Sequence, residues 1–439
     1  MNEHARIPKQ ALMQYGLLAT PLAFAGMPLY IHAPDFYTAQ FGAPLATIGV
    51  ILLLLRCFDA IQDPIIGRLS DQFANQRLGM MTAAALLLIA SFYGLFNPHT
   101  NHLILWFTIS MLCATTAFSI ISINLNTIGG LWRQDPFEKT RITTHREIFG
   151  LVGLLLAVVL PATLMQSMPP TQAFSWIAMI LAVIMMAAII VFIRWYRRHP
   201  TPDTSTLHQQ ISLFNTIKNL PTATRRFFTI YAISMLASSL PALLVLFFIR
   251  DRLGAEDLTG LFLLLYFIAG IAGMPLWQSI SKRKGKINTW MLAMLLAIAS
   301  FVWAFLLGAG DVWQYGVICV LSGIAFGADL ALPPSILADH IHAHDSEHNA
   351  AMQFGLFTFL AKAALALASF IGLSLLDVAA FKPDSDNTPS ALLMLSALYA
   401  LLPCIIKLFS VFLLTQSDLS GAHHEKTCHT HHHRSSDHA

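Results

Sequence analysis

Charged side chains are scarce in this sequence of 439 residues, where Asp, Glu, Lys and Arg together make up 11%. A soluble domain carries roughly 25% charged residues, so the shortage excludes an ordinary water-soluble protein. Hydrophobic residues make up 56% of the chain, and the mean hydropathy is +0.63. The formal net charge is only +3, and we expect no nucleic-acid partner.

A disulfide framework and the common catalytic motifs are also missing from the sequence. The five cysteines, four in apolar segments and Cys428 in a polar tail, form no disulfide framework. No glycine-rich phosphate loop occurs, and no Ser/His/Asp set is supported by a surrounding motif. We therefore expect neither an enzyme nor an ATP-driven pump, and no cofactor.

Apolar runs of spanning length are what the chain does contain. The first, from about residue 11, is long enough to be a retained helix instead of a signal peptide. The runs predict twelve transmembrane helices near 11–32, 43–66, 79–97, 102–128, 144–166, 172–195, 225–249, 257–280, 287–308, 312–337, 350–376 and 391–415. The expected fold is all-α and polytopic.

The longest internal polar stretch, 194–226, divides the helices into two sets of six. We predict an N-terminal bundle (1–197), a cytoplasmic loop (198–223), a C-terminal bundle (224–416) and a His-rich, disordered cytoplasmic tail (417–439). GRLSDQFANQRLGMM (67–81) and GMPLWQSISKRKGKINTWM (273–291) occupy corresponding loops, as in duplicated transporters.

Lysine and arginine are unevenly distributed over the loops. The loops on the side of the N-terminus carry most of them, whereas the other side has only Arg250, Arg252 and Lys382. The positive-inside rule then places both termini in the cytoplasm. We expect a multi-pass protein of the cell inner membrane, surrounded by lipid and monomeric.

The second predicted helix carries three charges in LLLLRCFDAIQDPIIGRLSD (52–71). Arg56, Asp59 and Asp63 stand at i, i+3 and i+7, so they share one helix face. Each costs roughly 2.5–3.5 kcal/mol at the centre of a bilayer. An internal ion pair between Arg56 and Asp59 would explain two of them. Two carboxylates one turn apart also suit a bound cation or a shared proton.

RCFDAIQDPIIGRLSD resembles the second-helix signature of the glycoside–pentoside–hexuronide:cation symporters, a branch of the major facilitator superfamily. Tyr15–Gly16, REIFGLVG (146–153), ADLALPPSILADHI (328–341) and MQFGLFTFLAKAALALASF (352–370) resemble other helices of that family. The resemblance implies a major facilitator fold of two six-helix halves. It also implies cation-coupled transport of a small solute by alternating access, with a cavity between the halves.

The resemblance also assigns roles to individual residues. Asp59 and Asp63 match the family's cation-binding carboxylates, Ser119 matches a hydroxyl ligand, and Gln62 stands where Asn is common. The implied coupling cation is Na⁺ or H⁺.

Arg146 matches an arginine at the solute cavity of the family, and Lys362 matches a functional lysine. An ammonium group inside a span needs a carboxylate partner, which for Lys362 could be Asp329, Asp59 or Asp63. Asp329 precedes Pro333 and Pro334, which break the helix as cavity-lining segments often do. Asp329 could therefore pair with Lys362 or contact the solute directly.

The solute site departs from that of the sugar-transporting members. Ala23 and Ser122 stand where those members have acidic residues, so a galactoside substrate is not favoured. Asn124 and Asn126 are expected to line the cavity instead.

Three further charged residues are candidates for gate residues. Asp71 and Arg77 match the inner gate of the superfamily, and Asp339 is expected to gate or cap the end of its own helix.

Two stretches, DHIHAHDSEH (339–348) and the tail 422–439, are rich in histidine. Neutral imidazoles bind Zn²⁺, Cu or Ni, but the tail lacks a fixed ligand spacing. It is expected to be solvated, with His431, His432 and His433 as weak metal candidates.

The resulting prediction is a symporter for a small organic solute, possibly sugar-like. Three alternatives remain open at this point: a transporter of lysophospholipids or other amphiphiles, a membrane receptor or sensor that does not transport, and a heavy-metal exporter.

Overall fold

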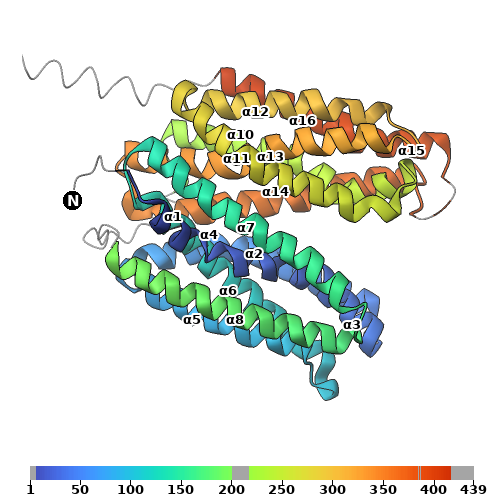
Figure 1. Ribbon diagram of the computed structural model, residues 1–439, viewed down its shortest axis with the longest axis horizontal. Helices are drawn as coiled ribbons and strands as arrows, with labels where there is room; N and C mark the ends of the chain where they lie inside the picture. The colour runs from blue at the N-terminus through green and yellow to red at the C-terminus, as the bar shows by residue number, and fades with distance from the viewer. Residues whose placement is uncertain (1–5, 200–216, 384, 386, 417–439) are drawn as a thin grey trace, which may run out of the picture. The chain divides into compact units, whose positions relative to one another are not determined.

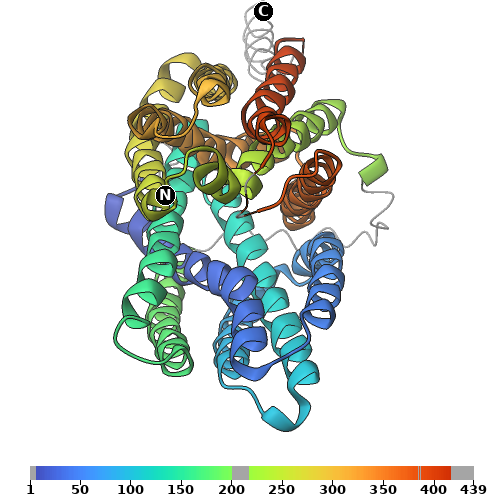
Figure 2. The ribbon, with the colours of Figure 1, turned by 90° about the vertical axis from the view of Figure 1, so that its right-hand side faces the viewer.

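The computed structural model describes residues 6–199, 217–383, 385 and 387–416, and every regular element in this part of the chain is a helix. Figure 1 and Figure 2 show the helices from two directions. Eleven helices within the described residues are long and apolar enough to cross a membrane. Helix α4 (Leu45–Gln72) is not among them, because Arg56, Asp59 and Asp63 interrupt its middle. Its 28 residues would still span the roughly 30 Å hydrocarbon core. The predicted all-α membrane fold is confirmed.

Most helix ends lie within a few residues of the predicted ones, with two larger differences. The first span continues from Lys9 to Phe41 and stops where Gly42 adopts φ +67°, a left-handed conformation that favours glycine. Helix α7 begins at Pro136, where residue 144 was expected. The Asp135 carboxylate caps it by accepting a hydrogen bond from the Glu138 N–H at 2.8 Å, so the polar segment after Pro136 is helical.

The chain forms two compact units, residues 1–213 with 347–359 and residues 214–346 with 360–439. The first contains α1 (Lys9–Gly16), α2 (Ala19–Met27), α3 (Ala33–Phe41), α4, α5 (Arg77–Phe96), α6 (Leu103–Leu131), α7 (Pro136–Leu164) and α8 (Pro170–Arg198). The second contains α10 (Thr222–Phe247), α11 (Thr259–Lys284), α12 (Lys286–Phe301), α13 (Val312–Ala343), α15 (Pro389–Ser396) and α16 (Leu402–Thr415). Helix α14 (Ala350–Val378) begins in the first unit and continues into the second.

Small residues allow the closest helix pairs in each unit. Helices α2 and α7 meet where a Cβ on Gly153 would overlap the Thr20 carbonyl oxygen. In the second unit α11 packs along α13, and side chains at Gly323 or Gly327 would overlap backbone carbonyls of α11. Figure 1 shows α5 and α8 side by side in the first unit, where they contact one another.

Three π-helical turns interrupt these long helices, at Pro28–His32, Phe248–Arg252 and Ala397–Leu401. A π turn inserts one extra residue per turn and often marks a functional site. The first carries Tyr30 and the third carries Tyr399, and both side chains enter sites described below.

Candidate functional site

The carboxylate of Asp59 is the centre of a polar cluster in the first unit. Its Oδ1 accepts hydrogen bonds from Gln62 Nε2 at 2.9 Å and Ser119 Oγ at 3.2 Å. Its Oδ2 accepts one from the Tyr30 hydroxyl at 3.1 Å. Thr116 in turn donates to Gln62 Oε1 at 2.9 Å. Ser119 and Gln62, both suggested by the sequence, thus meet at Asp59, and Tyr30 and Thr116 join them.

Asp63 lies one turn further along α4 and is completely buried. Pro64 follows it directly and lacks the N–H that a helix interior normally uses, which loosens the backbone at this point. The start of α14 packs here, since a Cβ on Gly355 would overlap the Asp63 carbonyl oxygen. The cluster therefore places two buried carboxylates on adjacent turns, beside a close backbone contact.

Arg56 does not form the expected ion pair with Asp59 in the described part of the chain. Its guanidinium lies over the ring of Tyr30, 5.7 Å from the ring centroid, and its side chain is exposed. Asp59 instead accepts a hydrogen bond from the Tyr30 hydroxyl. A π turn 26 residues earlier brings Tyr30 between the two, and the α4 sequence contains no sign of it.

A second cluster in the first unit surrounds Arg146 on α7. Its guanidinium donates to the side-chain oxygen of Asn126 and forms an ion pair with Glu147. Asn126 donates to the Ser122 carbonyl at 2.9 Å, which orients its amide toward Arg146. The sequence suggested Arg146, Asn126 and Ser122. It did not suggest Glu147, although a carboxylate next to a buried arginine was visible in HREIFG.

Asn124 takes a different place from the one expected of a cavity residue. It is fully buried, its Oδ1 accepts a 2.6 Å hydrogen bond from Ser70, and its Nδ2 donates to the Ile120 carbonyl. Ser70 also accepts from Arg77 Nε at 3.2 Å. Asn124 and Asn126 are two positions apart on α6, so their side chains project in nearly opposite directions. Asn124 faces α4, while Asn126 faces Arg146. Asn124 thus belongs to the surroundings of Arg77.

Asp71 and Arg77 form a buried ion pair of 2.8 Å, with side chains that are 7% and 1% exposed. Asp71 also accepts the backbone N–H groups of Ala351 and Met352, at 2.9 and 2.8 Å. These are the first turn of α14, where a carboxylate satisfies unpaired donors and complements the helix dipole. One carboxylate thus joins the last turn of α4 to the beginning of α14.

In the second unit Asp329 pairs with Lys407 of α16. The same carboxylate accepts hydrogen bonds from Trp290 Nε1 at 2.9 Å and Ser238 Oγ at 3.4 Å. The sequence offers Lys362 as a partner for Asp329. Lys407 fills that place because α16 packs against α10 and α12, and both of these helices contact α13. Lys362 lies half-buried on α14, and its role stays a prediction.

Asp339 lies near the C-terminal end of α13 and forms an ion pair of 2.5 Å with Lys286. Lys286 also donates to the Ser335 carbonyl at 3.2 Å. Lys286 begins α12 as Arg77 begins α5, so the two basic residues hold corresponding places in the repeated loops. The histidine tail, with His431, His432 and His433, lies outside the described residues.

The chain matches a family model described as "MFS/sugar transport protein" over residues 12–420. The chain belongs to this family. A glucuronide carrier protein homolog of Escherichia coli is 24% identical over 411 residues, covering 89% of this chain and 87% of the carrier. An isoprimeverose transporter of Lactiplantibacillus pentosus is 23% identical, covering 66% of this chain and 63% of the transporter. The predicted relation to the glycoside–pentoside–hexuronide symporters is confirmed.

Solved structures share the fold of this major facilitator chain at low sequence identity. The E. coli fucose:proton symporter has a TM-score of 0.65 at 13% identity, covering 91% of this chain and 97% of the symporter. A bacterial homologue of the iron transporter ferroportin has a TM-score of 0.69 at 15% identity, covering 91% and 99%. The protein is therefore a multi-pass membrane transporter that binds a small molecule, and not an enzyme.

Proposed function

We propose that this protein is a symporter that uses alternating access to couple the movement of a cation, Na⁺ or H⁺, to uptake of a sugar-like solute. The observation that carries the proposal is the cluster at Asp59. A buried carboxylate there meets a hydroxyl, a carboxamide and a phenol, within one turn of a second buried carboxylate.

The donor set suits a hard cation. Na⁺ prefers several oxygen ligands, as other hard cations do, and Asp59, Asp63 and Ser119 supply carboxylate and hydroxyl oxygens on adjacent elements. Gln62 would add its amide oxygen by turning that oxygen from Thr116 toward Asp59. A proton shared by the two carboxylates would relieve the same repulsion. In either case a bound positive charge lowers the free-energy cost of two buried carboxylates inside the bilayer.

The solute would bind where rigid hydrogen-bonding groups gather. Arg146 presents a planar fork of donors, and the acceptors Glu147 and Asn126 lie beside it. Such alternation of donors and acceptors fits the vicinal hydroxyls of a sugar, including the glucuronide and isoprimeverose named for the relatives. Ser122, Asp329 and Lys362 remain further candidates for contact with the solute.

The ion pair of Asp71 and Arg77 would serve as the inner gate. Opening toward the cytoplasm would have to separate Asp71 from the first turn of α14, and both termini would lie on that side of a cell inner membrane. Asp339 with Lys286 would form a second closing pair on the same side.

The experiment uses purified protein in proteoliposomes and measures uptake of radiolabelled glucuronides, isoprimeverose and other sugars under an imposed Na⁺ or pH gradient. One gradient should drive accumulation of at least one solute. Asp59→Asn and Asp63→Asn should each abolish the stimulation by the cation, because the charge that attracts it is gone, while exchange of solute without a gradient persists.

Asp35→Asn provides the control, because Asp35 is an exposed carboxylate of the same unit, in the first turn of α3. This variant should retain gradient-driven uptake. Unchanged coupling in the Asp59→Asn/Asp63→Asn double variant would refute the cation site. Absence of flux for every sugar in the wild-type protein would refute the assignment of the solute.

A further inference from the structure

The helix bundle of the second unit contains a partly open cavity of about 260 Å³. Helices α10, α11, α12, α13 and α16 supply the walls, together with the π turn that carries Tyr399. The Asp59 cluster and the Arg146 cluster contribute no residue to it. Neither cluster therefore lines the cavity, and Asp329 is the residue that the cavity shares with the further candidates for solute contact.

Besides Tyr266, six aromatic side chains line the cavity, among aliphatic and small residues. The rings belong to Phe262, Phe267, Phe301, Tyr315, Phe326 and Tyr399. Phe248 stacks on Tyr399 at 4.1 Å between centroids, and the Tyr315 and Tyr399 hydroxyls bond one another at 2.7 Å, which fixes both rings. A cavity of about 150 Å³ with apolar walls admits benzene. This cavity therefore has room for one six-membered ring with a short substituent.

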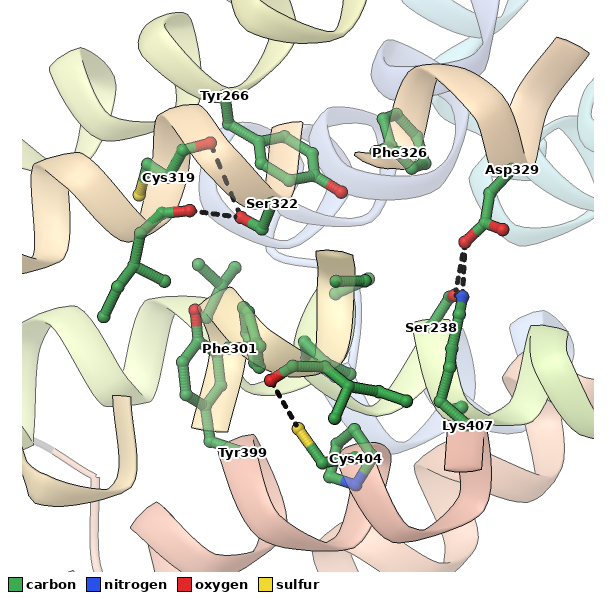
Figure 3. Close-up of a pocket in the computed structure, with 18 of the residues that line it drawn as sticks. Ser238, Tyr266, Phe301, Cys319, Ser322, Phe326, Asp329, Tyr399, Cys404 and Lys407 are labelled. Carbon is green, nitrogen blue, oxygen red and sulfur yellow. Dashed lines mark hydrogen bonds and ion pairs between the residues drawn. The ribbon is translucent and has the colours of Figure 1, made fainter. Parts of the chain in front are cut away.

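One end of the cavity is polar. Figure 3 shows Ser238, Asp329 and Lys407 meeting there, while Tyr399 and Phe301 lie toward the other end. The Lys407 ammonium donates to Asp329 and, at 2.8 Å, to Ser238 Oγ. An ammonium has three hydrogens to donate. The described residues supply no acceptor for the third, and Lys407 is only 6% exposed.

Tyr266 adds a second polar group on the wall. Its hydroxyl makes no hydrogen bond among those found in the described residues, and the side chain lines the cavity (Figure 3). A ligand oxygen could therefore accept from Lys407 or Tyr266, or from both.

The charge balance restricts what the ligand can be. Lys407 and Asp329 carry opposite charges and form a pair with no net charge. Asp329 also accepts hydrogen bonds from Trp290 and Ser238. An ionised ligand would bring an uncompensated charge into an apolar, aromatic space, which is costly. A neutral oxygen avoids that cost and still satisfies the remaining donor.

We infer that this cavity is a binding site for a small neutral ring compound that carries a hydroxyl or carbonyl group. The ring lies among the aromatic side chains, and the oxygen accepts a hydrogen bond at the Lys407 and Tyr266 end. The site does not depend on cation coupling at Asp59.

Fluorinated probes test the inference by ¹⁹F NMR on the full-length protein in lipid nanodiscs, with empty nanodiscs as the blank. 4-Fluorophenol should bind saturably. Fluorobenzene lacks the oxygen and should bind about tenfold more weakly, since one hydrogen bond to a charged group is lost. The 4-fluorobenzoate anion should bind more weakly than 4-fluorophenol.

Two kinds of variant locate the binding. Ser322→Phe and, independently, Ala297→Leu fill the cavity and should abolish binding of 4-fluorophenol, provided that circular dichroism and gel filtration show folded protein. The double variant Asp329→Asn/Lys407→Met removes the pair without leaving a lone buried charge, and it should make fluorobenzene and 4-fluorophenol bind nearly equally.

Binding of 4-fluorophenol no stronger than to empty nanodiscs would overturn the inference. So would binding that survives in both folded cavity-filling variants, as would equal affinity of the wild-type protein for fluorobenzene, which would indicate a general lipid-chain crevice. Asp59→Asn should lose cation-driven uptake and keep probe binding, so failure of the symport proposal is distinguishable from failure of this one.

Discussion

The carboxylate of Asp71 lies 2.8 Å from the guanidinium of Arg77 and at the same time accepts two backbone N–H groups from the first turn of α14. Arg77 further donates to Ser70, which bonds Asn124. Because the Arg77 side chain is only 1% exposed, these partners and not water stabilise its positive charge. Removal of either charge therefore leaves the other buried without compensation.

Arg77→Met should destabilise the protein by about 3–5 kcal/mol, the usual cost of breaking a buried ion pair from one side. The double variant Arg77→Met/Asp71→Asn should recover part of this loss, since no lone charge remains. Chemical unfolding in detergent, followed by tryptophan fluorescence, measures both. A single variant no less stable than the double variant would contradict the pairing energy.

The corresponding pair in the second unit should matter less. Asp339 is 24% exposed, whereas Asp71 is 7% exposed, so water can solvate Asp339 when Lys286 is lost. Lys286→Met should therefore cost about 1–2 kcal/mol, within the range for removing one partner of a hydrogen-bonded charge. The same unfolding assay compares the two, and a larger loss for Lys286→Met than for Arg77→Met would show that exposure does not govern the difference.

The Asp59 cluster could be partly predicted because helix geometry relates its members. Asp59, Gln62 and Asp63 lie three and four residues apart on one helix, so their common face follows from the sequence. Ser119 required the family resemblance, which supplied the neighbouring helix. Tyr30 could not be predicted, because a π turn shifts its direction by an amount that a regular helical repeat does not contain.

The partner of Asp329 could not be predicted from the sequence, for a different reason. Lys362 and Lys407 both lie within apolar spans, and charge alone favours neither. The choice depends on which lysine the packing of the helices brings to Asp329, a long-range property of the bundle. Asn124 and Asn126 present the same problem on a smaller scale, since two positions along a helix point to nearly opposite sides.

Gly355→Ala should disturb the contact between α4 and α14. The added Cβ would overlap the Asp63 carbonyl oxygen and approach the Pro64 backbone, so the two helices would have to move apart beside the proposed cation site. Apparent cation affinity in uptake should fall several-fold. Gly79→Ala is the matched control, because a Cβ there meets nothing within 4 Å and alanine favours the helix by about 1 kcal/mol. Equal behaviour of the two variants would argue against the close packing.

Tyr30→Phe should weaken cation coupling without unfolding the protein. The phenol donates to Asp59 Oδ2 and holds the carboxylate toward Ser119 and Gln62, and its ring also supports Arg56. Phenylalanine keeps the ring and loses the hydrogen bond, which is worth about 1.5–3 kcal/mol when it reaches a charged group. The apparent affinity for the cation should therefore fall roughly tenfold. Arg56→Gln tests the other side of the ring: it leaves the hydroxyl in place and should change cation affinity less than Tyr30→Phe. A larger loss of cation affinity for Arg56→Gln than for Tyr30→Phe would mean that the Arg56 charge, and not the Tyr30 hydroxyl, controls cation binding at Asp59.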